Sequence, residues 1–382
     1  MTGIALLGST GSIGRQTLEV LAAHPDRFRL LGIAAGRATS DFRSQLADWP
    51  EAKAWSADGR PEGLPAERWA DGGLEDLATA DGVEMVVVAT TGMTALPAVL
   101  AALRAGRRVA LANKETLVTG GHLVAELLDA QGGDPLDRLR PVDSEHSAIW
   151  QCLLGERLEE VSRLVLTASG GPFRDRPPSE LAGVRPDEAL AHPTWRMGPK
   201  ITIDSATLVN KAFEAIEAKW LYRLPYSRID AVIHPQSVVH SLVEFTDGSY
   251  KAQLGVPDMR LPIQYALSFP DRLPSPARTA PPEAWGDLQF LPLDEGRFPG
   301  YATVRAAAEV GGNRGTILNA ADEVAVAAFL GGAIGFGGIA ATIEEAVARW
   351  GAAPEPDLDG IAALDAEVRA ALSAELGLGG AA

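Results

Sequence analysis

The sequence predicts a mixed α/β protein in three parts: an N-terminal parallel-sheet domain, a central α+β domain and a C-terminal helical bundle. Over residues 1–146, short apolar runs alternate with helical patterns, as in parallel strands joined by crossover helices. Residues 147–268 place strand-like runs around one long helical pattern, and the Ala-rich residues 301–382 have helical spacing. A chain of 382 residues is also too long for one ordinary core.

The strand candidates of the N-terminal part are residues 4–7, 28–34, 85–89 and 109–112. The last three lack polar alternation, which is expected of strands covered on both faces. The candidates of the central part are residues 163–167, 231–233, 238–245 and 250–254. They predict a largely antiparallel sheet around a long helix that begins near Ser205.

The last third of the chain begins with residues 269–300, whose seven prolines predict an ordered linker. Helical spacing follows around residues 317–330, 339–350 and 364–372. The glycine-rich residues 331–338 contain no basic residue, so we expect a helix–helix connection there and not a phosphate loop.

Charge and composition exclude some classes of protein. The net charge of −16 argues against a nucleic-acid surface, although a few cations in a pocket would still suit a phosphorylated ligand. The single cysteine, Cys152, excludes an internal disulfide, and its apolar neighbours predict a buried structural residue. The chain opens on a strand-like run and has no apolar window long enough for a membrane span. We therefore expect a soluble cytoplasmic protein without a membrane partner.

A dinucleotide site is predicted at the start of the chain. Gly8, Gly11 and Gly14 follow the first strand candidate and open a helix near Arg15. Glycines permit a tight turn, and the helix N-terminus offers free N–H groups to a pyrophosphate. This context favours a Rossmann-like domain; the alternative is a glycine-rich turn without a ligand.

The end of the second strand candidate indicates which dinucleotide binds. Gly36, Arg37 and Ala38 follow it, and no acid occurs before Asp41. An NAD site would place a carboxylate there, whereas a cation suits the 2′-phosphate of NADPH. NADPH is therefore favoured; the alternative is that Arg37 is merely solvated.

Polar residues also follow the next two strand candidates. Residues 89–92 come after the third, and Asn113, Lys114 and Glu115 come after the fourth. The carboxyl ends of parallel strands meet at one edge of the sheet, where ligands of open α/β folds bind. These residues therefore predict part of a site, with a helix cap as the alternative.

A pair of carboxylates predicts a metal site. Asp143 and Glu145 stand at i and i+2, so an extended backbone would point both to one side. Carboxylate oxygens suit hard ions such as Mg²⁺ or Mn²⁺. The alternative is an ordinary helix start, where Asp-x-Glu is also common. We expect His146 to pack beside the site without binding the metal.

The predicted helix after Asp204 and Ser205, either of which can cap it, divides into two faces. The apolar face gathers Leu208, Val209, Ala212, Phe213, Ile216 and Trp220, and the opposite face gathers Thr207, Asn210, Lys211 and Glu214. On this mixed face, Glu214 could supply a third carboxylate to the metal, and Asn210 and Lys211 could bind a phosphate. The alternative is a solvated polar face.

Two further segments suggest contacts with an anionic ligand. Ser169, Gly170 and Gly171 follow a strand candidate and would form a small anion nest. Residues 192–200 combine prolines and a glycine with large side chains such as Trp195, which suggests a lid over the substrate. The alternative is a packed loop.

Taken in order, these motifs resemble the 1-deoxy-D-xylulose 5-phosphate reductoisomerase family over nearly the whole chain. The matching blocks are residues 8–14, 111–115, 142–146, 168–173, 192–200, 204–214, 233–241, 255–260 and 318–325. The resemblance implies conversion of 1-deoxy-D-xylulose 5-phosphate to 2-C-methyl-D-erythritol 4-phosphate in non-mevalonate isoprenoid synthesis. It implies a retro-aldol rearrangement and reduction, with NADPH and a divalent ion (Mg²⁺, Mn²⁺ or Co²⁺). It also implies a homodimer and inhibition by fosmidomycin-type hydroxamates.

The resemblance also assigns residues. The metal ligands would be Asp143, Glu145 and Glu214, and the substrate oxygens near the metal would be held by Lys114, Ser144 and Glu145. The phosphate would be bound by Ser169, Ser205, Asn210 and Lys211. The flap would include His192, Trp195 and Met197, with Gly198 near the nicotinamide. NADPH would contact Thr10, Gly11, Ser12, Ile13, Gly36, Arg37, Asn113 and Glu115. The candidate catalytic residues are Lys114, Glu145 and His192, and Lys114, Glu145 and a water at the metal are the candidate proton shuttles.

Two positions depart from the family pattern, and two rival functions remain. Ala38, a candidate NADPH contact, and Ser147, beside the metal motif, stand where the family often has Asn. One rival is a Rossmann-type semialdehyde dehydrogenase. That enzyme needs a nucleophilic cysteine, and the apolar surroundings of Cys152 are poor for this role. The other is a non-catalytic sensor of NADPH and a sugar phosphate.

Overall fold

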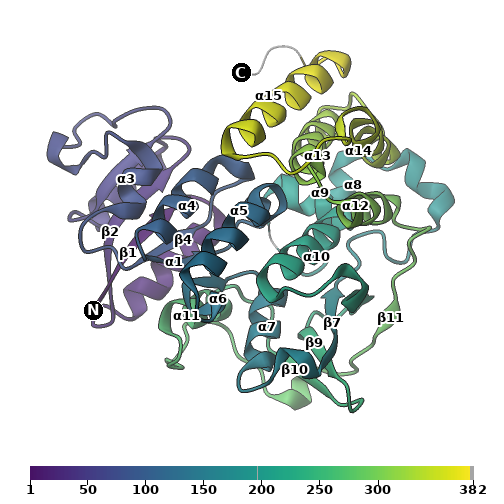
Figure 1. Ribbon diagram of the computed structural model, residues 1–382, viewed down its shortest axis with the longest axis horizontal. Helices are drawn as coiled ribbons and strands as arrows, with labels where there is room; N and C mark the ends of the chain where they lie inside the picture. The colour runs from purple at the N-terminus through teal and green to yellow at the C-terminus, as the bar shows by residue number, and fades with distance from the viewer. Residues whose placement is uncertain (196, 379–382) are drawn as a thin grey trace. The chain divides into compact units, whose positions relative to one another are not determined.

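The computed structural model describes residues 1–195 and 197–378, which divide into two compact units (Figure 1). Unit 1 consists of Met1–Thr116, Leu123–Gln151 and Asp258–Thr279. Unit 2 consists of Leu117–His122, Cys152–Pro257 and the described residues from 280 onward. Each unit contains its own sheet and its own apolar core.

Unit 1 is built on a six-stranded sheet in the order β3-β2-β1-β4-β5-β6, and all its strand pairs are parallel. The strands are β1 Thr2–Leu7, β2 Phe28–Ala35, β3 Lys53–Ser56, β4 Met85–Val88, β5 Arg108–Leu111 and β6 Leu139–Pro141. This order is that of the dinucleotide-binding fold and confirms the Rossmann-like prediction. Strands β3 and β6 were not predicted, because neither is an apolar run: β3 includes Lys53 and Ser56, and β6 includes Arg140 and Pro141.

The helices that contribute to unit 1 are α1 Ser12–Ala23, α2 Ser40–Asp48, α3 Gly73–Thr79, α4 Leu96–Arg104, α5 Glu115–Gln131, α6 Pro135–Arg138, α7 Ser144–Leu153 and α11 Arg260–Ser268. The predicted division placed α11 in the central domain, whereas the structure places it in unit 1. Its Ile263 and Leu267 share the core of Ile4 and Leu21. The Arg140 guanidinium also donates to the Ala266 carbonyl at 2.8 Å.

Unit 2 contains a five-stranded sheet in the order β10-β9-β7-β8-β11. The strands are β7 Val161–Ala168, β8 Ile229–Ile233, β9 Val239–Phe245, β10 Tyr250–Leu254 and β11 Leu291–Pro292. Only the β7–β8 pair is parallel among these pairs, which confirms the largely antiparallel prediction. Because β11 pairs with β8, part of the predicted linker belongs to this sheet.

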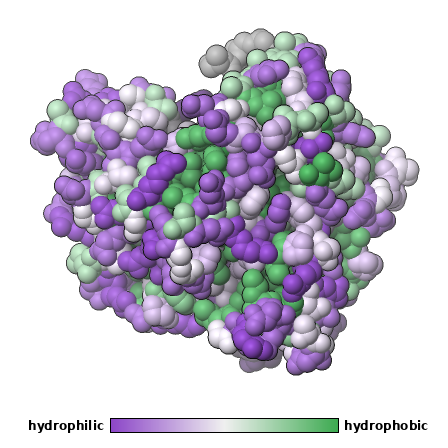
Figure 2. All heavy atoms as spheres, in the orientation of Figure 1, coloured by the Kyte–Doolittle hydropathy of each residue, from purple (hydrophilic) through white to green (hydrophobic). Residues whose placement is uncertain are grey.

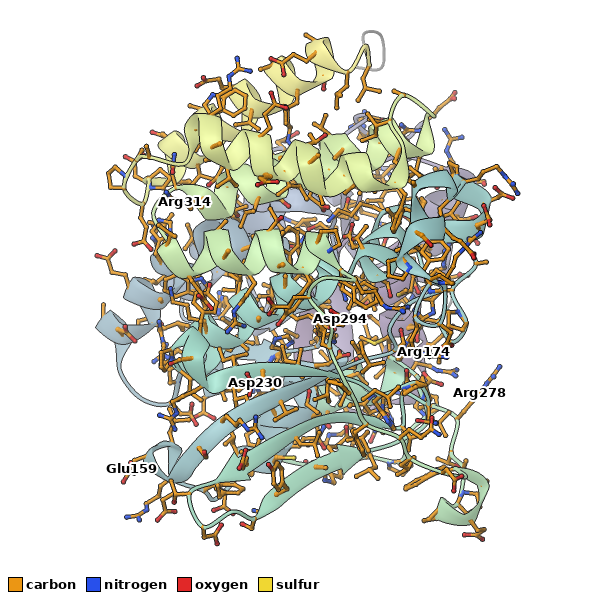
Figure 3. All side chains as sticks on the ribbon, turned by 90° about the vertical axis from the view of Figure 1, so that its right-hand side faces the viewer. Glu159, Arg174, Asp230, Arg278, Asp294 and Arg314 are labelled. Atoms are coloured by element: carbon orange, nitrogen blue, oxygen red, sulfur yellow. The ribbon has the colours of Figure 1, made fainter. Side chains whose placement is uncertain are left out.

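The helices of unit 2 are α8 Pro186–Ala189, α9 Pro199–Thr207, α10 Val209–Tyr222, α12 Pro299–Val310, α13 Arg314–Leu330, α14 Phe336–Trp350 and α15 Leu358–Glu375. Figure 3 shows α10 and α12 over one face of the sheet, with the later helices stacked beyond them. One apolar core joins Phe213 of α10 to Ile317, Phe329 and Ile343. The C-terminal helices are therefore layers of unit 2, whereas the sequence predicted a separate domain. Residues 331–335 do connect α13 to α14, as expected.

The long helix predicted from Ser205 is in fact two helices. Helix α9 ends at Thr207 and α10 begins at Val209, because Leu208 adopts a left-handed conformation with φ of 57°. The Thr207 hydroxyl accepts the Val209 N–H at 3.3 Å and supports the break. Asp204 and Ser205 lie inside α9, so the prediction that one of them caps the second helix is wrong.

Hydrophilic residues cover most of the face shown in Figure 2, while the large aliphatic and aromatic side chains fill the two cores. Within the described part of the chain, no helix combines the length and the apolar character that crossing a membrane requires.

Candidate functional site

The glycine loop of unit 1 requires glycine at two positions. Gly8 has φ of +93°, and a Cβ there would lie 2.3 Å from the Ala89 carbonyl oxygen. A Cβ on Gly14 would lie 2.2 Å from the Gly8 carbonyl oxygen. Gly11 caps α1, and Ser12 beside it is exposed. The loop therefore presents backbone N–H groups at a helix N-terminus, as a pyrophosphate requires.

A buried pair that the sequence did not reveal anchors this loop. The Ser9 hydroxyl donates to the Gln45 side-chain oxygen at 2.7 Å. The Gln45 amide in turn donates to the Ser9 carbonyl at 3.0 Å. Both residues are buried, so α2 holds the loop in place. No sequence signal pointed to this contact, because the burial of Gln45 follows only from the tertiary fold.

The end of β2 is open to solvent, as a site for the adenosine end of a dinucleotide should be. Gly36 and Arg37 are exposed, and a Cβ on Gly36 would meet nothing within 4 Å. The fold adds a carboxylate here, because the Ala38 N–H donates to Asp58 Oδ2 at 3.0 Å. Asp58 follows β3, which pairs with β2, so the sequence order concealed it.

The Asn113 side chain is occupied within the protein. Its amide donates to the carbonyls of Thr90 and Gly92, both at 2.8 Å, and its oxygen accepts the Thr116 N–H at 2.8 Å. It therefore also accepts an N–H of the first turn of α5, whose N-cap residue is Lys114. Any contact between Asn113 and a cofactor is left to the backbone.

The acidic motif lies at the start of α7 and not on an extended segment, so that prediction is wrong. Asp143 precedes the helix, and its Oδ1 accepts the Ser144 N–H at 2.9 Å. The Ser144 hydroxyl donates to Glu145 Oε2 at 2.6 Å. The two carboxyl groups still converge, with one oxygen of Asp143 and one of Glu145 within 4.8 Å of each other. Such oxygen donors fit a hard divalent ion.

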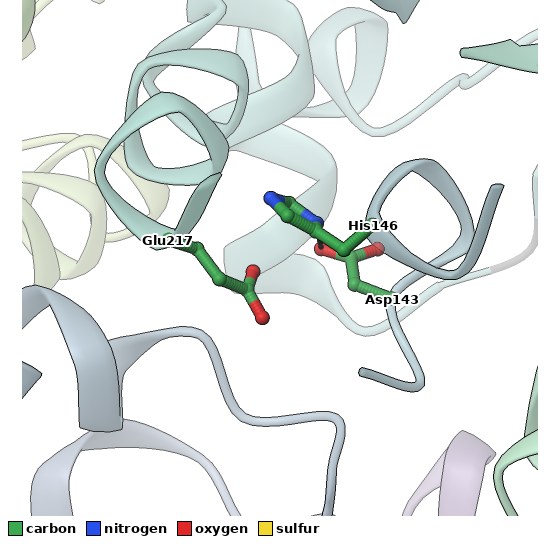
Figure 4. Close-up of side chains that lie close together, drawn as sticks. All are labelled: Asp143, His146 and Glu217. Carbon is green, nitrogen blue, oxygen red and sulfur yellow. Dashed lines mark ion pairs between the residues drawn. The ribbon is translucent and has the colours of Figure 1, made fainter. Parts of the chain in front are cut away.

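A buried lysine lies against this motif. Lys114 Nζ is 2.8 Å from Asp143 Oδ2, and the side chain is only 7% exposed. His146 is fully buried, and its Nδ1 is 3.9 Å from the same oxygen. Figure 4 draws His146 and Asp143 close together. His146 therefore lies beside Asp143, and its role at the metal stays a prediction.

In unit 2, His192 joins the loop after β7 to helix α9. Its Nδ1 accepts the N–H groups of Thr194 at 3.1 Å and Trp195 at 2.9 Å. An Nδ1 that accepts cannot carry the proton of a neutral imidazole, so that proton resides on Nε2. Nε2 lies 3.1 Å from the hydroxyl oxygens of both Ser169 and Ser205. Burial lowers the pKa of His192, which favours this neutral form.

The predicted anion nest packs directly on α9. Gly171 has φ of +64°, and a Cβ there would lie 2.7 Å from the Ser205 carbonyl oxygen. The Gly171 N–H donates to the Ser169 hydroxyl at 3.2 Å. Arg174 donates to the Ser169 carbonyl at 2.9 Å. Ser169, His192 and Ser205 thus form one polar cluster from three separate segments.

The polar face of α10 is buried. Asn210 donates to Glu214 Oε1 at 2.6 Å, and Lys211 forms an ion pair with the other oxygen of Glu214. Lys211 is 3% exposed and Glu214 1% exposed, so the alternative of a solvated face is wrong. Glu217, also drawn in Figure 4, is fully buried one turn further along α10.

The predicted flap leads into α9. Trp195 and Met197 are half-buried, and Gly198 is exposed. Gly198 caps α9, and its carbonyl accepts the Thr202 N–H at 3.1 Å. Arg196 lies outside the described residues.

Cys152 is buried, and burial raises the pKa of its thiol to about 11. A thiol with so high a pKa is not a nucleophile at neutral pH. This confirms the structural role predicted for Cys152 and disfavours a dehydrogenase that acylates cysteine.

Models of one family match the chain in three segments. These are the 1-deoxy-D-xylulose 5-phosphate reductoisomerase model over residues 4–121 and two models of C-terminal domains of the same enzyme, over residues 139–222 and 254–371. The chain belongs to the 1-deoxy-D-xylulose 5-phosphate reductoisomerase family. The resemblance found in the motifs is thereby confirmed.

Relatives in the reductoisomerase family match over nearly their full lengths. The enzyme of Thermomicrobium roseum is 50% identical over 371 residues, which cover 95% of this chain and 94% of the relative. That of Geobacillus kaustophilus is 47% identical, covering 97% and 98%. A reductoisomerase crystallised with NADPH, fosmidomycin and magnesium matches with a TM-score of 0.89 at 35% identity, covering 99% of both chains. The Zymomonas mobilis enzyme with NADPH matches with a TM-score of 0.85 at 36% identity, covering 98% of this chain and 99% of the other.

Proposed function

We propose that this chain converts 1-deoxy-D-xylulose 5-phosphate to 2-C-methyl-D-erythritol 4-phosphate in non-mevalonate isoprenoid biosynthesis. The reaction is a metal-assisted skeletal rearrangement, by retro-aldol cleavage and aldol addition, followed by hydride reduction. The Ser169–His192–Ser205 cluster carries the proposal, because it gives a member of this family a preformed site for the substrate phosphate.

The phosphate is bound by residues of unit 2. Ser169 and Ser205 supply hydroxyl donors, Asn210 an amide and Lys211 a positive charge. The Nε2–H of His192 is a further donor, held toward both serines by the backbone contacts of Nδ1. Binding energy from a phosphate remote from the reacting carbons positions the substrate.

Asp143, Glu145 and Glu214 hold the divalent ion in this proposal, and their hard oxygen donors fit Mg²⁺, Mn²⁺ or Co²⁺. A related structure was solved with magnesium. When bound, such an ion supplies Lewis-acid polarisation of the substrate carbonyl. Ser144 and Lys114 orient the substrate oxygens beside it. Lys114 and Glu145 are the side chains placed to hold or move a proton there.

NADPH binds to unit 1 in this proposal and supplies the hydride. Its contacts are Thr10, Gly11, Ser12, Ile13, Gly36, Arg37, Ala38, Asn113 and Glu115, with Gly198 near the nicotinamide. The steric demand for glycine at Gly8 and Gly14 supports this assignment, because it keeps the backbone open to a pyrophosphate.

The flap excludes water from the reacting carbons. Trp195 and Met197 are half-buried and supply the apolar surface for closure over the substrate. An aldehyde intermediate is thereby protected from side reactions until it is reduced.

The protein is a homodimer of the cytoplasm in this proposal. Among the described residues of unit 2, no α-helix covers the second face of the sheet (Figure 3). Tyr250 is 50% exposed on its edge strand β10, and β8 carries Asp230, which Figure 3 labels. The exposed side chains of Arg163, Asp230 and Tyr250 leave part of this sheet accessible for pairing with a second copy.

The decisive assay is NADPH oxidation with 1-deoxy-D-xylulose 5-phosphate, with and without EDTA. Turnover that EDTA abolishes and Mg²⁺ restores is the expected result. No turnover would point to a sensor, and turnover indifferent to chelation would contradict the metal-dependent mechanism.

Glu214→Gln tests the metal assignment more sharply. We expect a loss of activity of about a hundredfold or more, because an amide cannot replace a carboxylate ligand. The affinity for NADPH, measured by fluorescence titration, should be unchanged, since the NADPH contacts lie in unit 1 apart from Gly198. Glu344→Gln on an exposed turn of α14 is the matched control and should retain full activity. Loss of NADPH binding in Glu214→Gln would contradict the assignment of α10 to the metal site.

A further inference from the structure

An ion cluster with two buried carboxylates lies beside the flap, and the proposed mechanism gives it no part. Lys200 Nζ is 2.7 Å from Asp204 Oδ2 and 2.7 Å from Asp322 Oδ2. The Asp204 side chain is 3% exposed and that of Asp322 is fully buried. Lys200 also lies 5.2 Å from the ring centroid of Phe213. One ammonium group therefore contacts α9, α10 and α13.

The position of this cluster on α9 links two parts of the proposed site. Lys200 is in the first turn of α9, two residues after Gly198, where the flap ends. Asp204 directly precedes Ser205, whose hydroxyl faces His192. The same short helix thus carries the end of the flap and a phosphate-binding hydroxyl, and the lysine attaches it to α13.

The charges of the cluster are not balanced if both acids are ionised. Two carboxylates and one ammonium would leave a net charge of −1 in a buried place, which is unfavourable. Burial raises the pKa of Asp322, although Lys200 and the Asp204 side chain oppose part of this rise. On α13, Glu323 adds a further negative charge, and Arg369 of α15 pairs with Glu323 at 2.8 Å. Burial thus disfavours the charged form of Asp322.

Stability alone does not explain such a cluster, because apolar residues of similar volume often replace buried ion pairs without loss. An ion cluster does fix geometry, since each hydrogen bond demands a defined distance and direction.

We propose that Lys200, Asp204 and Asp322 form a clamp that fixes the first turns of α9 on α13 and so positions the flap and the Ser205 hydroxyl for the substrate phosphate. The role of the phosphate rests on the proposed function; the clamp itself does not. These three are positioning residues, because none of them contacts the reacting atoms.

The test compares Lys200→Met, Asp322→Asn and the control Lys219→Met in the full-length protein. Lys219 is a matched lysine on α10, with its Nζ 4.5 Å from the centroid of the Trp220 ring. Lys200→Met removes the charge but keeps the stem. We expect its KM for 1-deoxy-D-xylulose 5-phosphate to rise about tenfold or more, with a smaller change in kcat and an unchanged Kd for NADPH. Asp322→Asn should stay within about twofold of the wild type, because an amide reproduces the hydrogen bonds of a protonated carboxyl.

Hydrogen exchange without substrate keeps the clamp testable if the proposed function fails. In Lys200→Met, the amides of residues 199–205 should exchange about tenfold faster than in the wild type, and in Lys219→Met they should not. Equal KM values and equal exchange in the two lysine variants would overturn the clamp. A rise in KM in Asp322→Asn as large as in Lys200→Met would contradict the idea that Asp322 acts as an uncharged carboxyl group. Wild-type protein without turnover, but with faster exchange in Lys200→Met, would leave the clamp standing and reject only the function.

Discussion

Protonation of the His192 imidazole is coupled to the geometry of the flap. Its Nδ1 accepts two backbone N–H groups, from Thr194 and Trp195, and only an unprotonated nitrogen can do so. Burial lowers the pKa of His192 below its usual 6.5. The contribution of the His192–Trp195 turn to the free energy of unfolding is therefore fully present above the pKa that His192 has in the unfolded chain. It is lost as pH falls through the lower pKa that His192 has in the folded protein.

We expect the KM for substrate to be flat near neutral pH and to rise as pH falls through the pKa of His192. Steady-state kinetics between about pH 5 and pH 8 would measure it. His192→Asn places an amide oxygen near the Nδ1 position but does not titrate, so its KM should be higher and the acid limb absent. An unchanged acid limb in His192→Asn would assign the titration to another group.

Asp58 is expected to weaken selectivity for NADPH. Its carboxylate accepts the Ala38 N–H at 3.0 Å, next to the exposed Arg37 that we assign to the 2′-phosphate. Asp58→Asn keeps an acceptor but removes a charge worth ~1 kcal/mol near a solvent-exposed phosphate, so NADPH should bind about fivefold more tightly. NADH affinity should not change, and the gain should shrink at high salt. Fluorescence titration measures both, with Glu62→Gln as an exposed control. Equal gains for both cofactors would contradict a phosphate effect.

At the scale of elements, the Ser169–Gly171 turn shows how close packing shapes the proposed phosphate site. Gly171→Ala would bring a Cβ to 2.7 Å from the Ser205 carbonyl in a backbone with φ of +64°. We expect a loss of about 1–3 kcal/mol in the free energy of unfolding and a markedly higher KM for the substrate. NADPH affinity should be retained, because the contacts that we propose for it lie in unit 1 apart from Gly198.

Thermal unfolding and kinetics together check Gly171→Ala against Gly183→Ala, where a Cβ would meet nothing within 4 Å. A stability loss shared by both variants would show that the effect is a general one of alanine for glycine. An unchanged KM in Gly171→Ala would show that the turn does not contribute to binding of the substrate phosphate.

The same scale shows where sequence patterns failed. The apolar period correctly predicted helix from about Ser205 but missed the helical residues 199–204 before it and the break at Leu208. A left-handed leucine has no compositional signature. The Asp143–Glu145 pair was correctly predicted to converge but on the wrong backbone, since Asp-x-Glu fits a helix start equally well. The polar face of α10 was predicted from its period, and only burial decided that it is not solvated.

At the scale of the whole molecule, the parallel sheet and the glycine loop were predictable because local period and glycine geometry determine them. Contacts distant in sequence were not. Asp58 approaches Ala38 only because β3 pairs with β2. Asp322 meets Lys200 only because α13 packs on α9. The placement of α11 in unit 1 likewise depends on tertiary packing, and the composition of the adjoining segments does not predict it.

The division into two units leads to a prediction for the free ligands. NADPH alone should slow hydrogen exchange in residues 8–14 and 36–38 of unit 1, because ligand binding raises the cost of opening the segments that it contacts. Inorganic phosphate alone should slow exchange in residues 169–171 and 205–211 of unit 2 instead. Hydrogen-exchange mass spectrometry on the wild type, with each ligand at about a hundred times its Kd, distinguishes the two patterns. If NADPH protected the Ser169 turn and left residues 8–14 unchanged, the assignment of cofactor and phosphate to separate units would be wrong.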